Sequence, residues 1–155
     1  TTGASGFSGQ LFGSNTANLI RNVKTPLVVI PHEAEQCDPC KIAISTDFKF
    51  GVDDDIYNSI RQIALAYGSK INFINVTDKY KEEELAAIEK DFGCDIDFVY
   101  GHDIEEGIRE YLDDKKVDMI VFVAEKHGIF HSIFKPSISK TMAKELKIPM
   151  MILAQ

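Results

Sequence analysis

Long apolar runs, cysteines and an N-terminal leader are scarce or missing in this sequence of 155 residues. No apolar stretch approaches the roughly 18 residues that a membrane-spanning helix needs, which excludes a spanning protein. Three cysteines, an odd and small number, argue against a secreted fold held by disulfides. The chain starts at Thr1 with a polar stretch rich in glycine and serine, which does not match a signal peptide. We therefore expect a piece of a longer, cytoplasmic protein.

Acidic residues are absent from residues 1–31, called the head below. The head holds two of the 17 basic residues, Arg21 and Lys24, and none of the 24 acidic ones. The rest of the chain therefore carries the whole acidic excess, and the net charge is −7. This balance disfavours binding through a general basic field, so we expect no nucleic-acid partner. A hydrophobic content of 45% is typical of a globular protein rather than a disordered one.

Short apolar runs alternate with helical patterns from residue 41 onward. The apolar runs predict strands over residues 41–46, 71–76, 96–100, 118–124 and 149–153. The segments between them predict helices over residues 53–67, 79–92, 103–113 and about 137–147. This alternation predicts an α/β fold with an open five-stranded parallel sheet and helices on both of its faces.

Two of these helices have clear buried faces and ends. Apolar side chains recur at helical spacing in the first one, and we expect burial of Ile56, Ile60, Ile63, Ala64 and Tyr67. Gly68 is expected to end this helix. Asp103 is expected to cap the helix over 103–113. The predicted buried face of that helix comprises Ile104, Ile108, Tyr111 and Leu112.

The head repeats the end of the chain at an offset of 123 residues. Both segments predict a helix with a basic last turn, then a proline and a short apolar strand. The matching pairs are Ser14 and Ser137, Thr16 and Ser139, Leu19 and Met142, Lys24 and Lys147, and Pro26 and Pro149. The alternative is that any helix, proline and strand in this order would match as well. We interpret residues 1–31 as the closing helix and strand of a preceding copy, 32–39 as a linker and 40–155 as a complete domain.

Glycines in the head follow a pattern that suits an anion. Gly3-Ala-Ser-Gly6 is followed, after six residues, by Gly13-Ser14 at the start of the predicted helix. Glycines let backbone amides approach an anion closely, and a helix start favours negative charge. This pattern resembles the terminal motif of universal stress protein domains, and residues 40–155 resemble that family over the whole domain.

The resemblance implies a fold, a ligand and a set of site residues. The fold would be that of adenine nucleotide alpha hydrolases, which is Rossmann-like, and the ligand would be ATP. The phosphate-binding loop would comprise Gly3, Gly6, Gly13 and Ser14. Asp47, at the end of the first strand of the complete domain, would help to hold the nucleoside part.

The complete domain departs from this motif. Carried forward by 123 residues, the head glycines meet other residue types, namely Lys126 for Gly3, Ile129 for Gly6 and Pro136 for Gly13. Isoleucine disfavours positive φ and proline has no amide donor, so only Ser137, the counterpart of Ser14, keeps its residue type. We hypothesise that residues 40–155 bind ATP poorly or not at all. The loop in the head is expected to retain the ability to capture a phosphate ion.

Cysteines and histidines offer a second kind of chemistry. Cys37 and Cys40 form a C-x-x-C pair after His32, which leaves a redox or metal role open beside an incidental pair. His127 and His131 have the spacing of a two-histidine metal face, but the sequence fixes no carboxylate partner for them. Most acidic clusters fall at helix starts and are interpreted as solvated caps. We therefore predict no metal site and no catalytic residue.

These inferences favour a regulatory binding protein of the stress response rather than an enzyme. The closing strands, residues 26–30 and 149–153, are apolar, and in the family such strands pair across a dimer-like interface. We expect self-association through them, within the chain or between chains, and no membrane partner. The alternative is an ATP-binding or ATP-hydrolysing switch, in which the glycine loop of the head and Asp47 complete a site between copies.

Overall fold

The structure is a computed structural model that describes residues 25–34, 37–45, 54–77, 96–101, 103–124 and 146–154. These residues form six strands and two helices. In chain order they are β1 (Leu27–Val29), β2 (Lys41–Ser45), α2 (Asp54–Tyr67), β3 (Lys70–Thr77), β4 (Ile96–Tyr100), α4 (Ile104–Lys115), β5 (Met119–Ala124) and β6 (Met150–Ala154). The helix expected over 79–92 lies outside the described residues, as do residues 137–145 of the helix expected over about 137–147.

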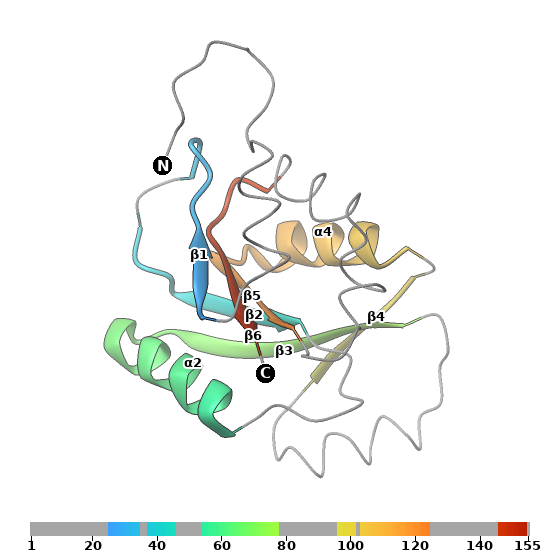
Figure 1. Cartoon of the computed structure of the whole chain (residues 1–155). Coiled ribbons are helices and arrows are strands. Elements are labelled where there is room, and N and C mark those ends of the chain that lie inside the picture. Colours follow the sequence, from blue (N-terminus) through green and yellow to red (C-terminus); the bar gives the residue numbers. More distant parts are fainter. Residues whose placement is uncertain are drawn as a thin grey trace.

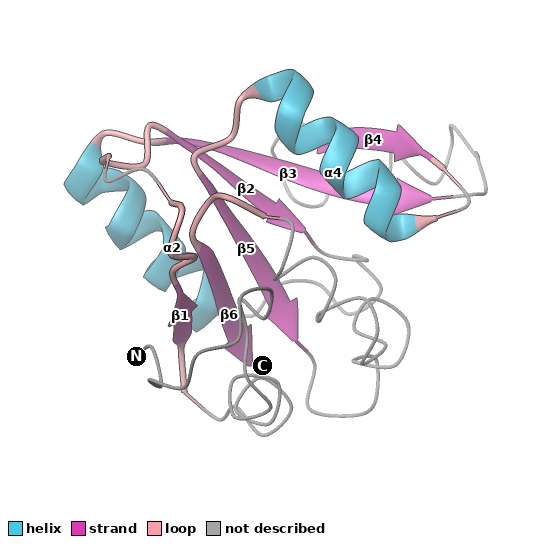
Figure 2. Cartoon of the chain, turned by 90° about the horizontal axis from the view of Figure 1, so that it is seen from above, coloured by secondary structure: helices cyan, strands magenta, loops and turns pink. Residues whose placement is uncertain are grey.

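All six strands belong to one sheet, in the order β1-β6-β5-β2-β3-β4. Strands β2 to β6 pair in parallel, which confirms the expected five-stranded parallel sheet. Strand β1 adds a sixth strand at the edge, antiparallel to β6, as Figure 2 shows. The closing strands of the head and of the domain therefore pair within one chain.

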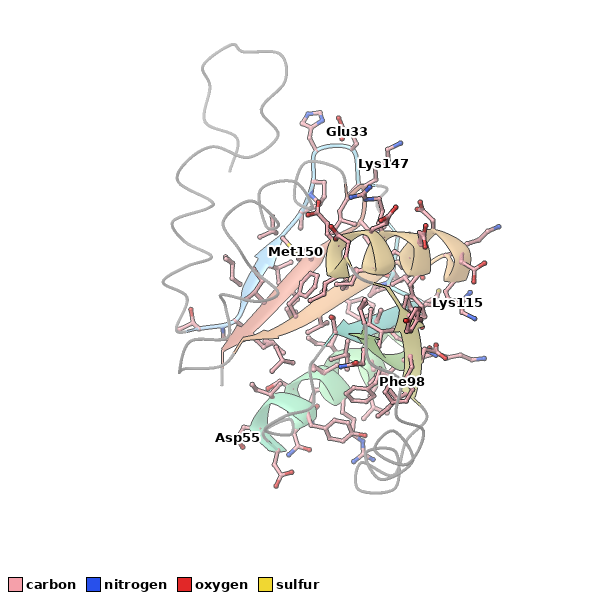
Figure 3. All side chains as sticks on the ribbon, turned by 90° about the vertical axis from the view of Figure 1, so that its right-hand side faces the viewer. Glu33, Asp55, Phe98, Lys115, Lys147 and Met150 are labelled. Atoms are coloured by element: carbon pink, nitrogen blue, oxygen red, sulfur yellow. The ribbon has the colours of Figure 1, made fainter. Side chains whose placement is uncertain are left out.

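The two described helices lie on opposite faces of the sheet (Figure 1). The core accordingly consists of two apolar layers. One contains Ile108 and Leu112 of α4, and the other contains Ile56 and Ile60 of α2. The central strand β5 contributes to both layers, since its successive side chains point to opposite faces. Met150 of β6 is 1% exposed and lies in the α4 layer (Figure 3).

Helix α2 follows the predicted pattern over most of its length. Ile56, Ile60 and Ala64 are buried as expected, and Gly68 follows the helix with φ of 67°. A positive φ costs glycine little, which explains why the helix ends there. The prediction for Tyr67 was wrong, because its side chain is 52% exposed. Tyr67 is the last residue of the helix, beyond the turn that packs on the sheet.

Helix α4 has the predicted cap and buried face. Asp103 is extended, and its Oδ1 accepts hydrogen bonds from the backbone N–H groups of Glu105 (2.8 Å) and Glu106 (3.1 Å). Three of the four residues expected on the inner face are buried, and Ile104 is partly buried against the same core. At the other end Lys116 adopts a left-handed conformation and its N–H bonds to the carbonyl of Leu112. The cap and the core contacts together fix α4 over β3 and β4.

The expected end of the last helix is not helical. Residues 146 and 147 are irregular, although the side chain of Leu146 is buried in the α4 layer. The turn before β6 ends in Pro149, whose carbonyl accepts a hydrogen bond from the Ile120 N–H at 3.1 Å. A proline at this point does not interrupt the strand, because it precedes the first residue of β6.

The amino ends of β2 and β5 are joined by side chains as well as by the sheet. Asp118 Oδ2 accepts the Lys41 N–H at 2.8 Å, and the Asp118 N–H donates to the Lys41 carbonyl at 3.0 Å. Lys41 Nζ donates to the carbonyl of Lys115 at the end of α4 (2.8 Å). These bonds hold the carboxyl end of α4 close to the amino ends of the two central strands, β2 and β5.

Gly107 in α4 permits a close approach of the helix to the sheet. A Cβ at this position would lie 2.8 Å from Val76 Cγ1 and 3.3 Å from Val99 Cγ1. Both neighbours are β-branched and therefore have little rotamer freedom to move aside. The glycine is thus required by packing, although glycine inside a helix is less favourable than alanine by about 1 kcal/mol.

We predict that Gly107→Ala lowers the free energy of unfolding. The cost of overpacking, about 1–3 kcal/mol, exceeds the stability gained from the higher helix propensity of alanine. Urea unfolding followed by circular dichroism measures the change. Gly101→Ala is the matched control, since a Cβ there would meet its nearest atom at 3.6 Å. A Gly107→Ala variant as stable as the original chain would contradict the proposed close approach.

Candidate functional site

The strand order changes direction between β2 and β5, at the centre of the sheet. From β2 the chain moves through β3 to β4 on one side, and it then crosses to β5 and β6 on the other side. In open α/β sheets, ligands bind outside the carboxyl ends of the strands at such a switch point. The carboxyl ends of β2 and β5 therefore define the candidate site (Figure 2).

Ser45 is the last residue of β2 and lies at this point. It is 4% exposed and is the one buried polar side chain among the described residues. It is the register partner of Phe122 in β5, which is 1% exposed. Ser45 is not among the site residues predicted from the sequence. The available signal was a hydroxyl at the end of an otherwise apolar run, two residues before Asp47.

None of the residues predicted for the nucleotide site lies in the described part of the chain. They are Gly3, Gly6, Gly13, Ser14, Asp47 and Ser137. The structure describes the strand ends that precede two of them in the sequence. Asp47 follows the end of β2 by two residues, and the segment containing Ser137 follows the end of β5. The predicted roles of these six residues therefore stay predictions.

The amino end of α4 lies next to the carboxyl end of β4, but its first donors are already used. Two of its backbone N–H groups donate to Asp103 Oδ1, and the Gly107 N–H donates to the Asp103 carbonyl at 3.1 Å. The negative charge of the cap also opposes an anion at this position. This helix start is consequently unsuited to bind a phosphate.

A second polar cluster lies near the amino ends of β3 and β4, beneath α4. The Tyr111 hydroxyl donates to Asp97 Oδ2 at 2.6 Å, and Asn72 Nδ2 lies 3.5 Å from the same oxygen. Burial of the phenol, together with its hydrogen bond to Asp97 and the charge of that carboxylate, raises the pKa of Tyr111 well above its ordinary value. Because this cluster lies away from the switch point, we interpret it as structural. It fixes α4 to two strands.

The cysteine and histidine candidates show no assembled metal site. Cys37 and Cys40 are both exposed and form no disulfide, and His32 is exposed in the turn after β1. Within the described ranges no three histidine, cysteine, aspartate or glutamate side chains come together as a metal site would require. His127 and His131 lie outside those ranges. The redox or metal role of the C-x-x-C pair is left open by these observations.

No described helix combines the length and the apolar character needed to cross a membrane. A scan against protein-family models and a search of curated proteins both found no match to the sequence.

Solved structures, in contrast, match most of the chain. A universal stress protein from Archaeoglobus fulgidus DSM 4304 matches with a TM-score of 0.65 and 13% identity, over 90% of this chain and 53% of the other. A putative universal stress protein from Pseudomonas aeruginosa UCBPP-PA14 gives 0.67 and 12%, over 94% and 58%. A functionally unknown protein from Pseudomonas aeruginosa PAO1 gives 0.67 and 11%, over the same shares. The chain has the fold of universal stress proteins and spans little more than half the length of these structures.

The structural interpretation of the Tyr111 cluster predicts a specific pH dependence. Above pH about 10 an unfolded tyrosine loses its proton, whereas Tyr111 in the folded chain keeps it. The free energy of unfolding should therefore fall as the pH rises beyond that point. Tyr111→Phe should remove this part of the pH dependence and cost about 1–2 kcal/mol at neutral pH, since it removes a hydrogen bond to a charged group.

Urea unfolding at pH 7 and at about pH 11 measures both effects. Tyr67→Phe is the matched control, because Tyr67 is 52% exposed and no hydrogen bond to it is described. The interpretation would be wrong if Tyr111→Phe and Tyr67→Phe changed stability by the same amount at both pH values.

Proposed function

We propose that this chain is a universal-stress-protein-like regulatory module that acts by binding and association rather than by catalysis. We further propose that residues 40–155 bind ATP poorly or not at all. The fold supports the first statement, and the sequence at the switch point supports the second. A cytoplasmic location and a role in the stress response follow from the resemblance and are part of the same proposal.

The amino-acid sequence that follows β5 is the observation that carries the proposal. β5 ends at Ala124 at the switch point, beside β2. The next residues are those in which Ile129 and Pro136 stand at the positions of Gly6 and Gly13 of the head. A phosphate at a switch point is held by backbone amides that glycines leave accessible. A bulky side chain and a residue without an amide hydrogen are poor substitutes there.

Association is supported by the pairing of β1 with β6. Strand β6 has β5 on one edge and β1 on the other, so both of its edges are occupied within the chain. Residues 149–153 are consequently not free to pair with another molecule while β1 is bound. Any contact through the closing strands would use β1, whose Val28 is 46% exposed.

An ATP-dependent switch is the second candidate. It would use the glycine loop of the head together with Asp47, supplied by two different copies. One observation favours it, namely that Asp47 follows the buried Ser45 at the end of β2, next to the switch point at which open α/β sheets generally bind ligands. The Gly3, Gly6, Gly13 and Ser14 pattern would supply the phosphate loop.

Calorimetric titration of the chain with ATP and Mg²⁺ separates the two candidates. We expect no binding with a Kd below about 1 mM, which corresponds to a standard binding free energy of about −4 kcal/mol. Asp47→Asn and Gly13→Ala should then leave the titration unchanged. Asp113→Asn, an exposed acidic residue of α4, serves as the matched control.

A micromolar Kd would overturn the proposed lack of ATP binding. If Asp47→Asn and Gly13→Ala both weakened that binding while Asp113→Asn did not, the switch would be the correct function. Release of phosphate from ATP by the original chain, abolished in Asp47→Asn, would in addition overturn the non-catalytic assignment.

A further inference from the structure

Cys37 and Cys40 lie in the segment that connects β1 with β2. Both side chains are exposed, and neither forms a disulfide in the structure. Only Asp38 and Pro39 separate them. This is the spacing of cysteine pairs that cycle between dithiol and disulfide in redox proteins. A reagent in solution can therefore reach two thiols that are close neighbours in the chain.

The connecting segment is long enough to contain a closed ring. Strand β1 is antiparallel to β6, whereas β6, β5 and β2 are parallel, so β1 ends at the edge of the sheet where β2 begins. The segment must cross three strand spacings at this edge, about 14 Å. Residues 30–40 can extend over about 36 Å. A disulfide within a C-x-x-C pair shortens that reach by about 6 Å, which leaves both strands in place.

The carboxyl half of the C-x-x-C pair is held against the turn between α2 and β3. The Ser69 hydroxyl donates a hydrogen bond to the Pro39 carbonyl, and the Lys70 N–H donates to the Cys40 carbonyl at 2.8 Å. Neither bond involves Cys37, which belongs to no helix or strand. A turn that brings Cys37 toward Cys40 therefore leaves the pairing of the sheet intact.

We propose that Cys37 and Cys40 form a reversible redox site. Its substrate is a disulfide of low molecular mass, such as oxidised glutathione, and its product is a disulfide between the two cysteines. Exposed disulfides have relatively oxidising potentials and are the labile ones, so an excess of the reduced small thiol reopens this bond. The site goes beyond the proposed function and depends neither on ATP nor on association.

The reaction consists of two exchange steps. The thiolate of one cysteine attacks a sulfur of the small disulfide, whose S–S bond breaks, and one small thiolate leaves as a mixed disulfide forms. The thiolate of the other cysteine then attacks the protein sulfur of the mixed disulfide. This step forms the bond between Cys37 and Cys40 and releases the second small thiolate. Two electrons pass from the cysteines to the small disulfide, and the two protons lost by the cysteines are taken up by the released thiolates.

The second step is intramolecular, which determines the expected product. Groups joined by a short flexible linker have an effective concentration in the millimolar range. With about 0.1 mM oxidised glutathione, ring closure should therefore exceed modification by a second glutathione about ten-fold. The original chain should accumulate the internal disulfide rather than a glutathione adduct.

The experiment exposes the original chain to oxidised glutathione at that concentration, stops the exchange with acid and maps the cysteine peptides by mass spectrometry. We expect the internal disulfide in about ten-fold excess over the adducts. Cys37→Ser should instead keep a stable glutathione adduct at Cys40, and Cys40→Ser should keep one at Cys37. Asp38→Asn is the matched control, because it changes an exposed residue between the cysteines and should still close the ring. Reduced glutathione in excess should return the dithiol.

Stable adducts in the original chain, in the amounts found in the single-cysteine variants, would overturn the proposal, because the two thiols would not reach each other. Cysteines that stay unmodified, a bond from either of them to Cys94, or disulfide-linked dimers would overturn it as well. An internal disulfide that persists in excess reduced glutathione would contradict a reversible site. The ATP titration is independent of these measurements, so either proposal can fail without the other.

Discussion

The parallel pairing of β2 with β5 is the constraint on which the rest of the structure depends. It brings together two strands that are separated in the sequence by β3 and β4, and the sheet extends from this pair in opposite directions. The Asp118 and Lys41 bonds hold one end of this pair closed. The other end leads into the two segments that contain Asp47 and the residues after Ala124. The β2–β5 pair thus determines both the strand order of the sheet and the position of the candidate site.

Much of the fold could be predicted from the sequence because its signals are local. Apolar runs placed every strand within about two residues, and the carboxylate of Asp103 was identified as a cap before its hydrogen bonds were known. Helical periodicity predicts burial wrongly where an apolar residue lies at the end of a helix, as Tyr67 does. The Asp97 and Tyr111 bond was missed, since nothing in either segment indicates that β4 and α4 place these two side chains together.

The candidate site was predictable only in its location. Strand order determines where a crevice forms, and the alternation of strands and helices predicted a fold with such a switch point. The identity of the ligand depends on segments whose residues are known from the sequence alone. A glycine pattern can predict a phosphate loop, but chemistry depends on atoms within hydrogen-bonding distance of one another. That is why the resemblance supports a fold, whereas ligand binding and the role of Asp47 need a titration.

The pairing of β1 with β6 has a consequence for the order in which the chain assembles and opens. Its partners lie more than 120 residues apart in sequence, so this contact closes the longest loop in the sheet for only three residue pairs. Closing a loop of that length costs more conformational entropy than closing the shorter loops between the other paired strands. Three residue pairs offset only a small part of this cost. β1 should be the last strand to join during folding and the first to leave during local opening. When β1 leaves, the backbone N–H and C=O groups along that edge of β6 become accessible. The presence of this short strand therefore determines whether the edge of β6 is paired within the chain or open to another strand.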